Sequence, residues 1–292
     1  MTDARLLKDV RFHSHGARIA GALRVPAGKG PHPVVVMCTG MTLTKEVWLP
    51  ANAEWLCERG FATLNFDYRG WGESEGPRQR LAPAMQVEDV REAITFLETI
   101  PELDSTRVAL FGISLGAAVS VATAGVDQRV KAAVAVAGPM DLHRVWSTLP
   151  GFDGFNAKVH AARQKAVATG EVSFIKLTKL LAGDPATCAV IERDAKLIPQ
   201  WKPEATFESL ADLFEFKPEA VVDRISPRAV LFIETEHEET IAKGELASGL
   251  AKAREPKRLV TLKGLAHHEI YGGGAAFIPM MEAAREFFAE FL

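Results

Sequence analysis

The sequence has few of the features that mark secreted, membrane-bound or nucleic-acid-binding proteins. Its three cysteines, Cys38, Cys57 and Cys188, are scattered and form no Cys-x-x-Cys pair, which argues against a disulfide framework and a structural zinc site. The formal net charge of −3 leaves no basic excess to neutralise phosphates, so a nucleic-acid partner is not expected. No apolar run reaches membrane-spanning length, and residues 1–10 lack the apolar core of a signal peptide. We therefore expect a cytoplasmic protein without a membrane partner.

The sequence does contain apolar runs that alternate with amphipathic segments. Of its 292 residues, 48% are apolar and 24% are charged, a balance that allows a sizeable core. Continuous apolar runs predict strands buried on both faces at residues 34–38, 61–66, 108–111, 130–137, 229–233 and, more weakly, 258–262. Helical spacing predicts helices at residues 51–59, 85–99, 115–124 and 277–292. This alternation indicates an α/β fold with a mostly parallel central sheet and helices on both faces, and residues 11–25 predict an antiparallel hairpin at the sheet edge.

One long segment, residues 138–227, interrupts this alternation. It shows no clear strand pattern, and residues 161–169 and 174–181 within it look helical. An insertion of this kind between two core strands is expected to form a helical cap over the carboxyl ends of the strands. The predicted organisation is a core of residues 1–137 and 228–292 with a cap of residues 138–227. The oligomeric state stays open, and a homodimer is one alternative to a monomer.

The stretch Gly112-Ile113-Ser114-Leu115-Gly116 lies between a predicted strand and a predicted helix. A sharp turn at this point lifts the serine hydroxyl out of the sheet, and glycines without a Cβ let the strand and the helix approach closely. A Gly-x-Ser-x-Gly match arises by chance in about one chain in ten of this length. The match is therefore informative only because a predicted strand precedes it and a predicted helix follows it. This context favours Ser114 as a nucleophile.

Over nearly its whole length the chain resembles the α/β-hydrolase superfamily, with some likeness to dienelactone hydrolases, esterases and acyl hydrolases or transferases of polyketide pathways. The resemblance rests on GISLG at 112–116, FDYRGWGES at 66–74, GLAHHEIY at 264–271 and the loop after residues 34–38. It implies a catalytic triad in the chain order Ser, then Asp or Glu, then His. His267 matches the family's base, with Tyr271 as the aromatic residue that often follows, and His268 is the alternative.

The acid of the triad is expected after residues 229–233, in a loop that reads ETEHEE. Laid on the family's pattern, the acid falls at Glu238. The family usually has Asp at that position, and a His-Gly pair where this chain has Glu234 and Thr235. Glu236 is the second choice. Asp141 is the third, because some family members take their acid from the loop after the preceding strand.

The resemblance also implies an oxyanion hole formed by two backbone N–H groups. One belongs to Leu115, directly after the nucleophile, and the other to Met41, in the loop after the first predicted core strand. Thr39 stands where the family commonly has His, a difference that affects the conformation of this loop more than the chemistry. Asp67 and Arg69 match a family motif that braces the rim of the site, so we expect a structural role for them.

These residues predict a serine hydrolase, without cofactor or metal, that cleaves a small-molecule ester, thioester or amide through an acyl-enzyme on Ser114. Two other reactions of the same triad stay open, namely acyl transfer to an alcohol or amine and hydrolysis of a carbon–carbon bond. Residues 75–79 (EGPRQ) resemble strings in relatives tied to polyketide pathways, which is a hint of secondary metabolism. The alternative from a different class is a ligand-binding protein that retains an idle triad.

Overall fold

A single mostly parallel sheet organises the chain. The computed structural model describes residues 6–292, so residues 1–5, half of the segment inspected for a signal peptide, lie outside the described residues. Eight strands in the described part form one sheet in the order β1-β2-β4-β3-β5-β6-β9-β10. The predicted edge hairpin is formed by β1 and β2, β2 is antiparallel to β4, and the remaining neighbours are parallel. The strands are β1 (Leu6–Ser14), β2 (Ala17–Val25), β3 (His32–Cys38), β4 (Ala62–Phe66), β5 (Leu103–Ile113), β6 (Val130–Val136), β9 (Ala229–His237) and β10 (Lys257–Ala266).

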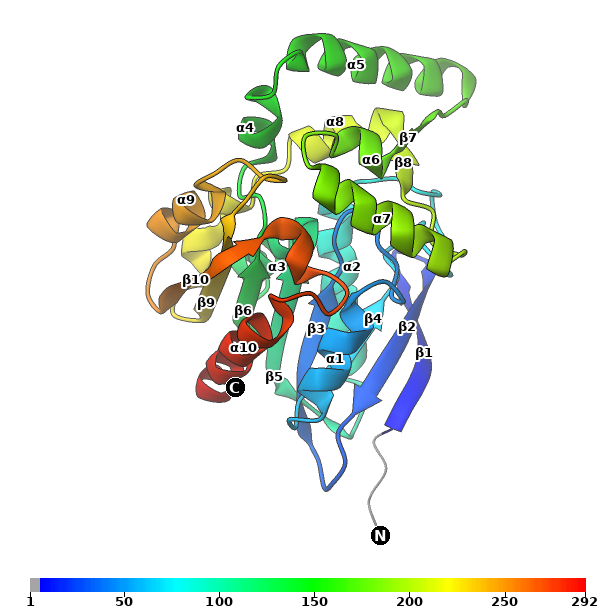
Figure 1. Cartoon of the computed structure of the whole chain (residues 1–292). Helices are drawn as coiled ribbons and strands as arrows, with labels where there is room; N and C mark the ends of the chain where they lie inside the picture. The colour runs from blue at the N-terminus through cyan, green and yellow to red at the C-terminus, as the bar shows by residue number, and fades with distance from the viewer. Residues whose placement is uncertain (1–5) are drawn as a thin grey trace.

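Helices cover both faces of this sheet, as the alternation predicted (Figure 1). Helices α1 and α10 pack on one face, and α2 and α3 pack on the other. Helix α9 lies against β9 and β10 at the end of the sheet. The helices of the core are α1 (Leu49–Cys57), α2 (Pro83–Leu97), α3 (Leu115–Val126), α9 (Glu245–Lys252) and α10 (Phe277–Phe291), with a short 3₁₀ turn η4 (His267–Ile270) before α10.

Alternate side chains of the central strands supply two separate hydrophobic cores. In β3, Val34 and Val36 belong to the core under α2 and α3, whereas Val35 and Met37 belong to the core under α1 and α10. All four side chains are fully buried. This double burial explains why the strand reads as an unbroken apolar run rather than as an alternating one.

The segment between β6 and β9 lies over the carboxyl ends of the strands, and α5 is its outermost element (Figure 1). Its first part is α4 (Leu142–Ser147), α5 (Phe152–Thr169), β7 (Phe174–Lys176), α6 (Leu177–Leu180) and α7 (Pro185–Leu197). Its second part is β8 (Glu204–Thr206), η1 (Phe207–Ser209), α8 (Leu210–Phe214), η2 (Pro218–Ala220) and η3 (Val222–Ile225). We call residues 138–227 the cap from here on.

The cap is not wholly helical. Residues 174–176, predicted to begin a helix, form strand β7 and pair antiparallel with β8 from Phe174↔Thr206 to Lys176↔Glu204. The partner strand β8 lies about 30 residues further along the chain, so no local sequence pattern predicts the pairing. A helix does follow at once as α6, but it spans only one turn.

Strand β9 runs further than its apolar stretch. The sequence predicted a strand at 229–233 followed by a loop, whereas the strand continues to His237. It continues because β10 pairs with it, at Glu234↔Thr261 and Thr235↔Leu262. Glu238 is therefore the first residue after the strand, at its carboxyl end. Within residues 6–292, no helix combines the length and the apolar character needed to cross a membrane.

Candidate active site

Ser114 lies between β5 and α3 in a strained backbone conformation. Its φ is 55° and its ψ is −123°, a region that residues other than glycine seldom adopt and that clusters at functional sites. A Cβ added at Gly112 would lie 2.1 Å from the carbonyl oxygen of Gly116, and one added at Gly116 would lie 2.0 Å from that of Cys38. Only glycine fits at either position, so the two glycines permit the close approach of strand and helix that the sequence predicted.

His267 and Glu238 lie in contact with each other. The Nδ1 atom of His267 is 3.0 Å from Oε2 of Glu238, and the imidazole side chain is fully buried. Three more groups hold the carboxylate, namely the Thr235 hydroxyl at 2.9 Å and the N–H groups of Thr240 at 2.9 Å and Ile241 at 3.0 Å. Burial raises the pKa of Glu238, but His267 and these hydrogen bonds outweigh it, so the pKa lies below the ordinary value.

The other candidates for the acid lie elsewhere. Glu236 accepts a hydrogen bond from the Gly264 N–H at 2.7 Å and pairs with Lys263 at the surface. Asp141 caps helix α4 and forms an ion pair with Lys217 at 2.6 Å. The neighbouring His268 is half-buried, and it is His267 that bonds to Glu238.

Tyr271 is a member of the site that the sequence indicated only as an aromatic neighbour. Its hydroxyl lies 2.8 Å from Nε2 of His267. Burial raises the pKa of the phenol, and a hydrogen bond from the Ser114 side chain opposes that rise. Among the hydrogen bonds formed by the described residues, those of the His267 ring go to Glu238 and Tyr271, and none goes to Ser114. The four side chains follow one another in the order Glu238, His267, Tyr271, Ser114.

Ser114 opens into an apolar cavity between core and cap. The predicted oxyanion-hole residues Met41 and Leu115 both line it. Leu115 is the first residue of α3, so its N–H has no acceptor within the helix. The apolar lining consists of Met41, Leu43, Trp48, Leu115, Pro139, Leu142, Val145, Trp146, Leu177, Leu181, Ile191 and Ile241, and the polar lining of Ser114, Thr187, Thr240 and Tyr271.

Cap helix α7 contacts the site near both of its ends. At its start, Asp184 accepts hydrogen bonds from the backbone N–H of Thr187 at 2.9 Å, from the Thr187 hydroxyl at 2.6 Å and from the Thr240 hydroxyl. Towards its end, the Asp194 carboxylate accepts a hydrogen bond from the indole of Trp48 at 2.7 Å. The Trp48 ring stacks on Tyr271 with 4.0 Å between the centroids. The cap is thereby joined both to the loop that holds Glu238 and to the aromatic residue beside His267.

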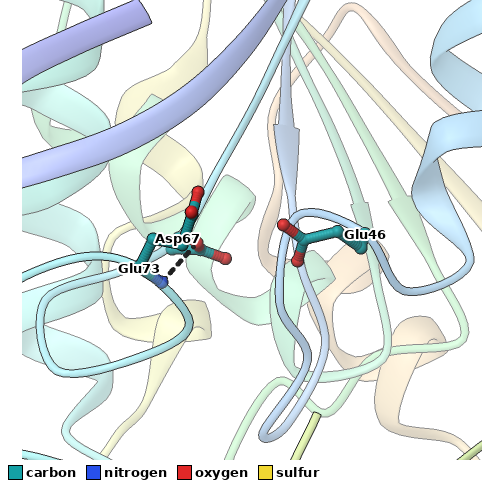
Figure 2. Close-up of side chains that lie close together, drawn as sticks. All are labelled: Glu46, Asp67 and Glu73. Atoms are coloured by element: carbon teal, nitrogen blue, oxygen red, sulfur yellow. Dashed lines mark hydrogen bonds between the residues drawn. The ribbon is translucent and has the colours of Figure 1, made fainter. Parts of the chain in front are cut away.

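A group of three carboxylates, Glu46, Asp67 and Glu73, lies close together outside this cavity (Figure 2). The Lys45 ammonium bonds to all three, at 3.1 Å from Asp67 and 2.6 Å from Glu73. Burial lowers the pKa of Lys45, but these carboxylates more than compensate, so the ammonium stays charged. Asp67 also accepts the backbone N–H groups of Lys45 and Glu73. The group therefore ties two loops together around a lysine, which fits the bracing role expected for Asp67 better than a metal site.

Arg69 braces the same region from another side. Its guanidinium bonds to Asp89 and Glu88, and its backbone N–H also bonds to the Asp89 carboxylate at 2.9 Å. The loop after β4 is thereby fastened to helix α2, as expected for a structural residue.

Comparison with known proteins defines the class. The alpha/beta hydrolase GrgF from Penicillium sp. sh18 superposes on this chain with a TM-score of 0.83 at 22% identity, covering 98% of this chain and 99% of that chain. The protein thus has the α/β-hydrolase fold. The profile of the family described as "Serine aminopeptidase, S33" matches residues 29–271. The chain belongs to this family and is an α/β-hydrolase enzyme.

Among the relatives that match most of the chain are a bacterial and a fungal protein. An Escherichia coli protein described as an "Uncharacterized 31.7 kDa protein in traX-finO intergenic region" is 30% identical over 273 residues, which cover 89% of this chain and 92% of the relative. "Acyltransferase drtE" of Aspergillus calidoustus is 28% identical over 269 residues, which cover 88% of this chain and 86% of the relative. The likeness to a protein named acyltransferase therefore extends over both core and cap.

Proposed function

We propose that this enzyme is a serine hydrolase that cleaves an ester, thioester or amide of a neutral, apolar acyl group through an acyl-enzyme on Ser114. One observation carries the proposal. A serine in a strained turn opens into an apolar cavity, and Tyr271 in the cavity lining contacts the His267–Glu238 pair. A base and an orienting carboxylate are what activates a hydroxyl that is otherwise a poor nucleophile, and the turn places that hydroxyl at the cavity.

The proposed reaction assigns one task to each group. Ser114 Oγ attacks the acyl carbonyl, and His267 receives its proton while ionised Glu238 stabilises the resulting imidazolium. The N–H groups of Leu115 and Met41 bind the oxyanion of the tetrahedral intermediate. His267 then gives the proton to the leaving group. In the second half, His267 activates a water that releases the acid.

The composition of the cavity supports a neutral acyl group. An enzyme that binds a free amino terminus needs an anionic partner for the ammonium, because an unpaired buried charge is costly. No Asp or Glu occurs among the described residues that line the cavity, and the nearby carboxylates of Glu238 and Asp184 are occupied by His267 and by two threonine hydroxyls. We therefore favour an apolar acyl chain over an N-terminal amino acid as the substrate group, although the family is described as a serine aminopeptidase.

Acyl transfer is the second candidate. It is supported by the apolar lining, which disfavours a bound water nucleophile, and by the relative named acyltransferase. An alcohol or amine would then replace water in the second half of the same reaction. Mass analysis of the products formed with and without an added alcohol or amine distinguishes the two reactions.

Covalent labelling with a fluorophosphonate tests the proposal, together with turnover of p-nitrophenyl esters of increasing acyl length. Ser114→Ala should abolish both. Ser120→Ala is the matched control, since Ser120 lies on helix α3, which begins directly after Ser114, and its hydroxyl bonds only to the Ala117 carbonyl at 2.8 Å. It should label at the wild-type rate. Folded wild-type protein that takes up no label would contradict the hydrolase and the transferase together and favour a ligand-binding protein.

A further inference from the structure

The Tyr271 hydroxyl occupies the position on His267 that a serine nucleophile ordinarily takes. It lies 2.8 Å from Nε2 of the imidazole, and the Ser114 hydroxyl lies beside the same phenol. Tyr271 is buried and lines the cavity next to Ser114. The base and the nucleophile are therefore connected through a third side chain.

The hydrogen atoms in this chain of contacts have a defined direction. The Glu238 carboxylate can only accept, so His267 must donate its Nδ1–H to it. The Nε2 atom of a neutral imidazole is then an acceptor, so the Tyr271 O–H must donate to it. The phenol oxygen keeps a lone pair that can accept the Ser114 O–H. With Ser114 donating to that lone pair, the order of donation would be Ser114 to Tyr271 to His267 to Glu238.

The phenol is held in this place by its ring. The ring stacks on Trp48 with 4.0 Å between centroids and an interplanar angle of 29°. Trp48 is fixed in turn by its hydrogen bond to Asp194 at 2.7 Å and by an edge contact with Trp201 at 5.5 Å between centroids. A ring fixed on that side is poorly suited to swing out of the way when substrate arrives. It is well suited to staying between Ser114 and His267 throughout the reaction.

We infer that Tyr271 is a catalytic residue that transfers the proton between Ser114 and His267. The inference rests on the proposed function and replaces direct contact between serine and histidine. As the Ser114 Oγ–carbonyl bond forms, the serine proton moves to the phenol oxygen and the phenol's own proton moves to Nε2. The phenol ends neutral, the imidazole becomes an imidazolium, and the negative charge resides on the substrate oxyanion. When the intermediate collapses to the acyl-enzyme, the bond to the leaving group breaks, the phenol gives its proton to the leaving group, and the imidazolium returns a proton to the phenol, so Ser114 stays acylated and His267 is neutral again.

Tyr271→Phe tests this inference, since it keeps the ring and its stacking and removes one hydroxyl. We expect the fluorophosphonate labelling rate to fall by at least about 100-fold, the lower end of what proton transfer by a positioned side chain contributes. In ester turnover, kcat should fall and KM should change little. Ser120→Ala is the control for the loss of a buried hydroxyl, because Ser120 is buried outside the cavity lining and its hydroxyl bonds to the Ala117 carbonyl at 2.8 Å. It should label at the wild-type rate.

A Tyr271→Phe enzyme that labels as fast as wild type, or faster, would overturn the inference, because His267 would then reach Ser114 directly. That result leaves the proposed function intact, whereas absence of label on wild-type Ser114 would overturn the function itself. Labelling of wild type in mixtures of H₂O and D₂O needs no substitution. Two moving protons predict a curved dependence of the rate on deuterium content, and a straight line or no dependence would exclude the transfer through Tyr271.

Discussion

Asp184, at the start of cap helix α7, accepts a hydrogen bond from Thr240, which lies two residues beyond Glu238. The Thr240 N–H is itself bonded to the Glu238 carboxylate at 2.9 Å. The start of the cap helix and the carboxylate beside His267 are thus two contacts apart. A cap residue contributes in this way to the shape of the loop that positions Glu238.

Replacing Asp184 should affect both stability and labelling. Asp184→Ala removes the cap of α7, worth about 1 kcal/mol of unfolding free energy, and frees Thr240, so the loop around Glu238 loses an anchor. We expect a lower midpoint in urea and a labelling rate reduced several-fold. Asp184→Asn keeps an oxygen acceptor and should lose less of both. Wild-type labelling by a measurably destabilised Asp184→Ala would show that the cap contact does not position Glu238.

Glu238→Gln and Glu236→Gln should behave very differently. An amide at 238 no longer stabilises the imidazolium and permits the wrong tautomer of His267, so we expect the labelling rate to fall by roughly 10³- to 10⁴-fold. Glu236→Gln breaks only surface contacts to Gly264 and Lys263 and should stay within about two-fold of wild type. Labelling rates of the two variants, measured under identical conditions, decide which residue is the acid of the triad. The assignment of Glu238 is wrong if Glu236→Gln alone loses activity.

The glycines around Ser114 should tolerate no side chain. In Gly116→Ala the new Cβ would lie 2.0 Å from the Cys38 carbonyl oxygen, so strand and helix must separate. We expect a loss of more than about 3 kcal/mol in unfolding free energy, or insoluble protein. Gly154→Ala is the control, since Gly154 lies within helix α5 with no atom within 4 Å of the added Cβ. It should raise stability by roughly 0.5–1 kcal/mol. Thermal and urea unfolding measure both changes.

Glu219 should make stability depend on pH in the acid range. Burial raises the pKa of this carboxyl, but Arg144, Lys252 and Ser248 outweigh it and lower the pKa from 4.5 to about 2. As pH falls from about 4.5 towards about 2, the unfolded chain binds a proton at Glu219 that the folded chain does not, so stability is lost through this window. The loss is of the order of 3 kcal/mol. In urea titrations across this range Glu219→Gln should show a shallower slope, and identical slopes would contradict the prediction.

The parts of the fold that depend on local pattern could be predicted from the sequence. Buried strands such as β3 read as apolar runs because both their faces are covered. The turn at Ser114 could be predicted because Gly112 and Gly116 meet backbone rather than side chains. Burial on both faces and close backbone packing each depend on a short run of consecutive residues, which the sequence displays directly.

Features that depend on partners distant in the chain could not be predicted in the same way. Strand β9 extends to His237 because β10 pairs with it, so the end of the strand, and with it the residue that faces His267, is not a local property. Strand β7 exists only because β8 pairs with it. The placement of the Tyr271 hydroxyl against Nε2 of His267 depends on how η4 folds and on the Trp48 ring that stacks on the phenol. The four-residue spacing between His267 and Tyr271 reveals neither of these.

The packing of glycine against backbone beneath Ser114 has a consequence for how such an enzyme can change. The serine is placed by main-chain contacts between β3, β5 and α3, and none of the side chains that shape the far wall of the cavity takes part in them. Cap residues such as Trp146, Leu181 and Ile191 can therefore be exchanged for larger or smaller ones without displacing the nucleophile. Substrate range and the placement of the nucleophile are encoded in separate parts of the chain, so one can drift or be engineered while the other is preserved.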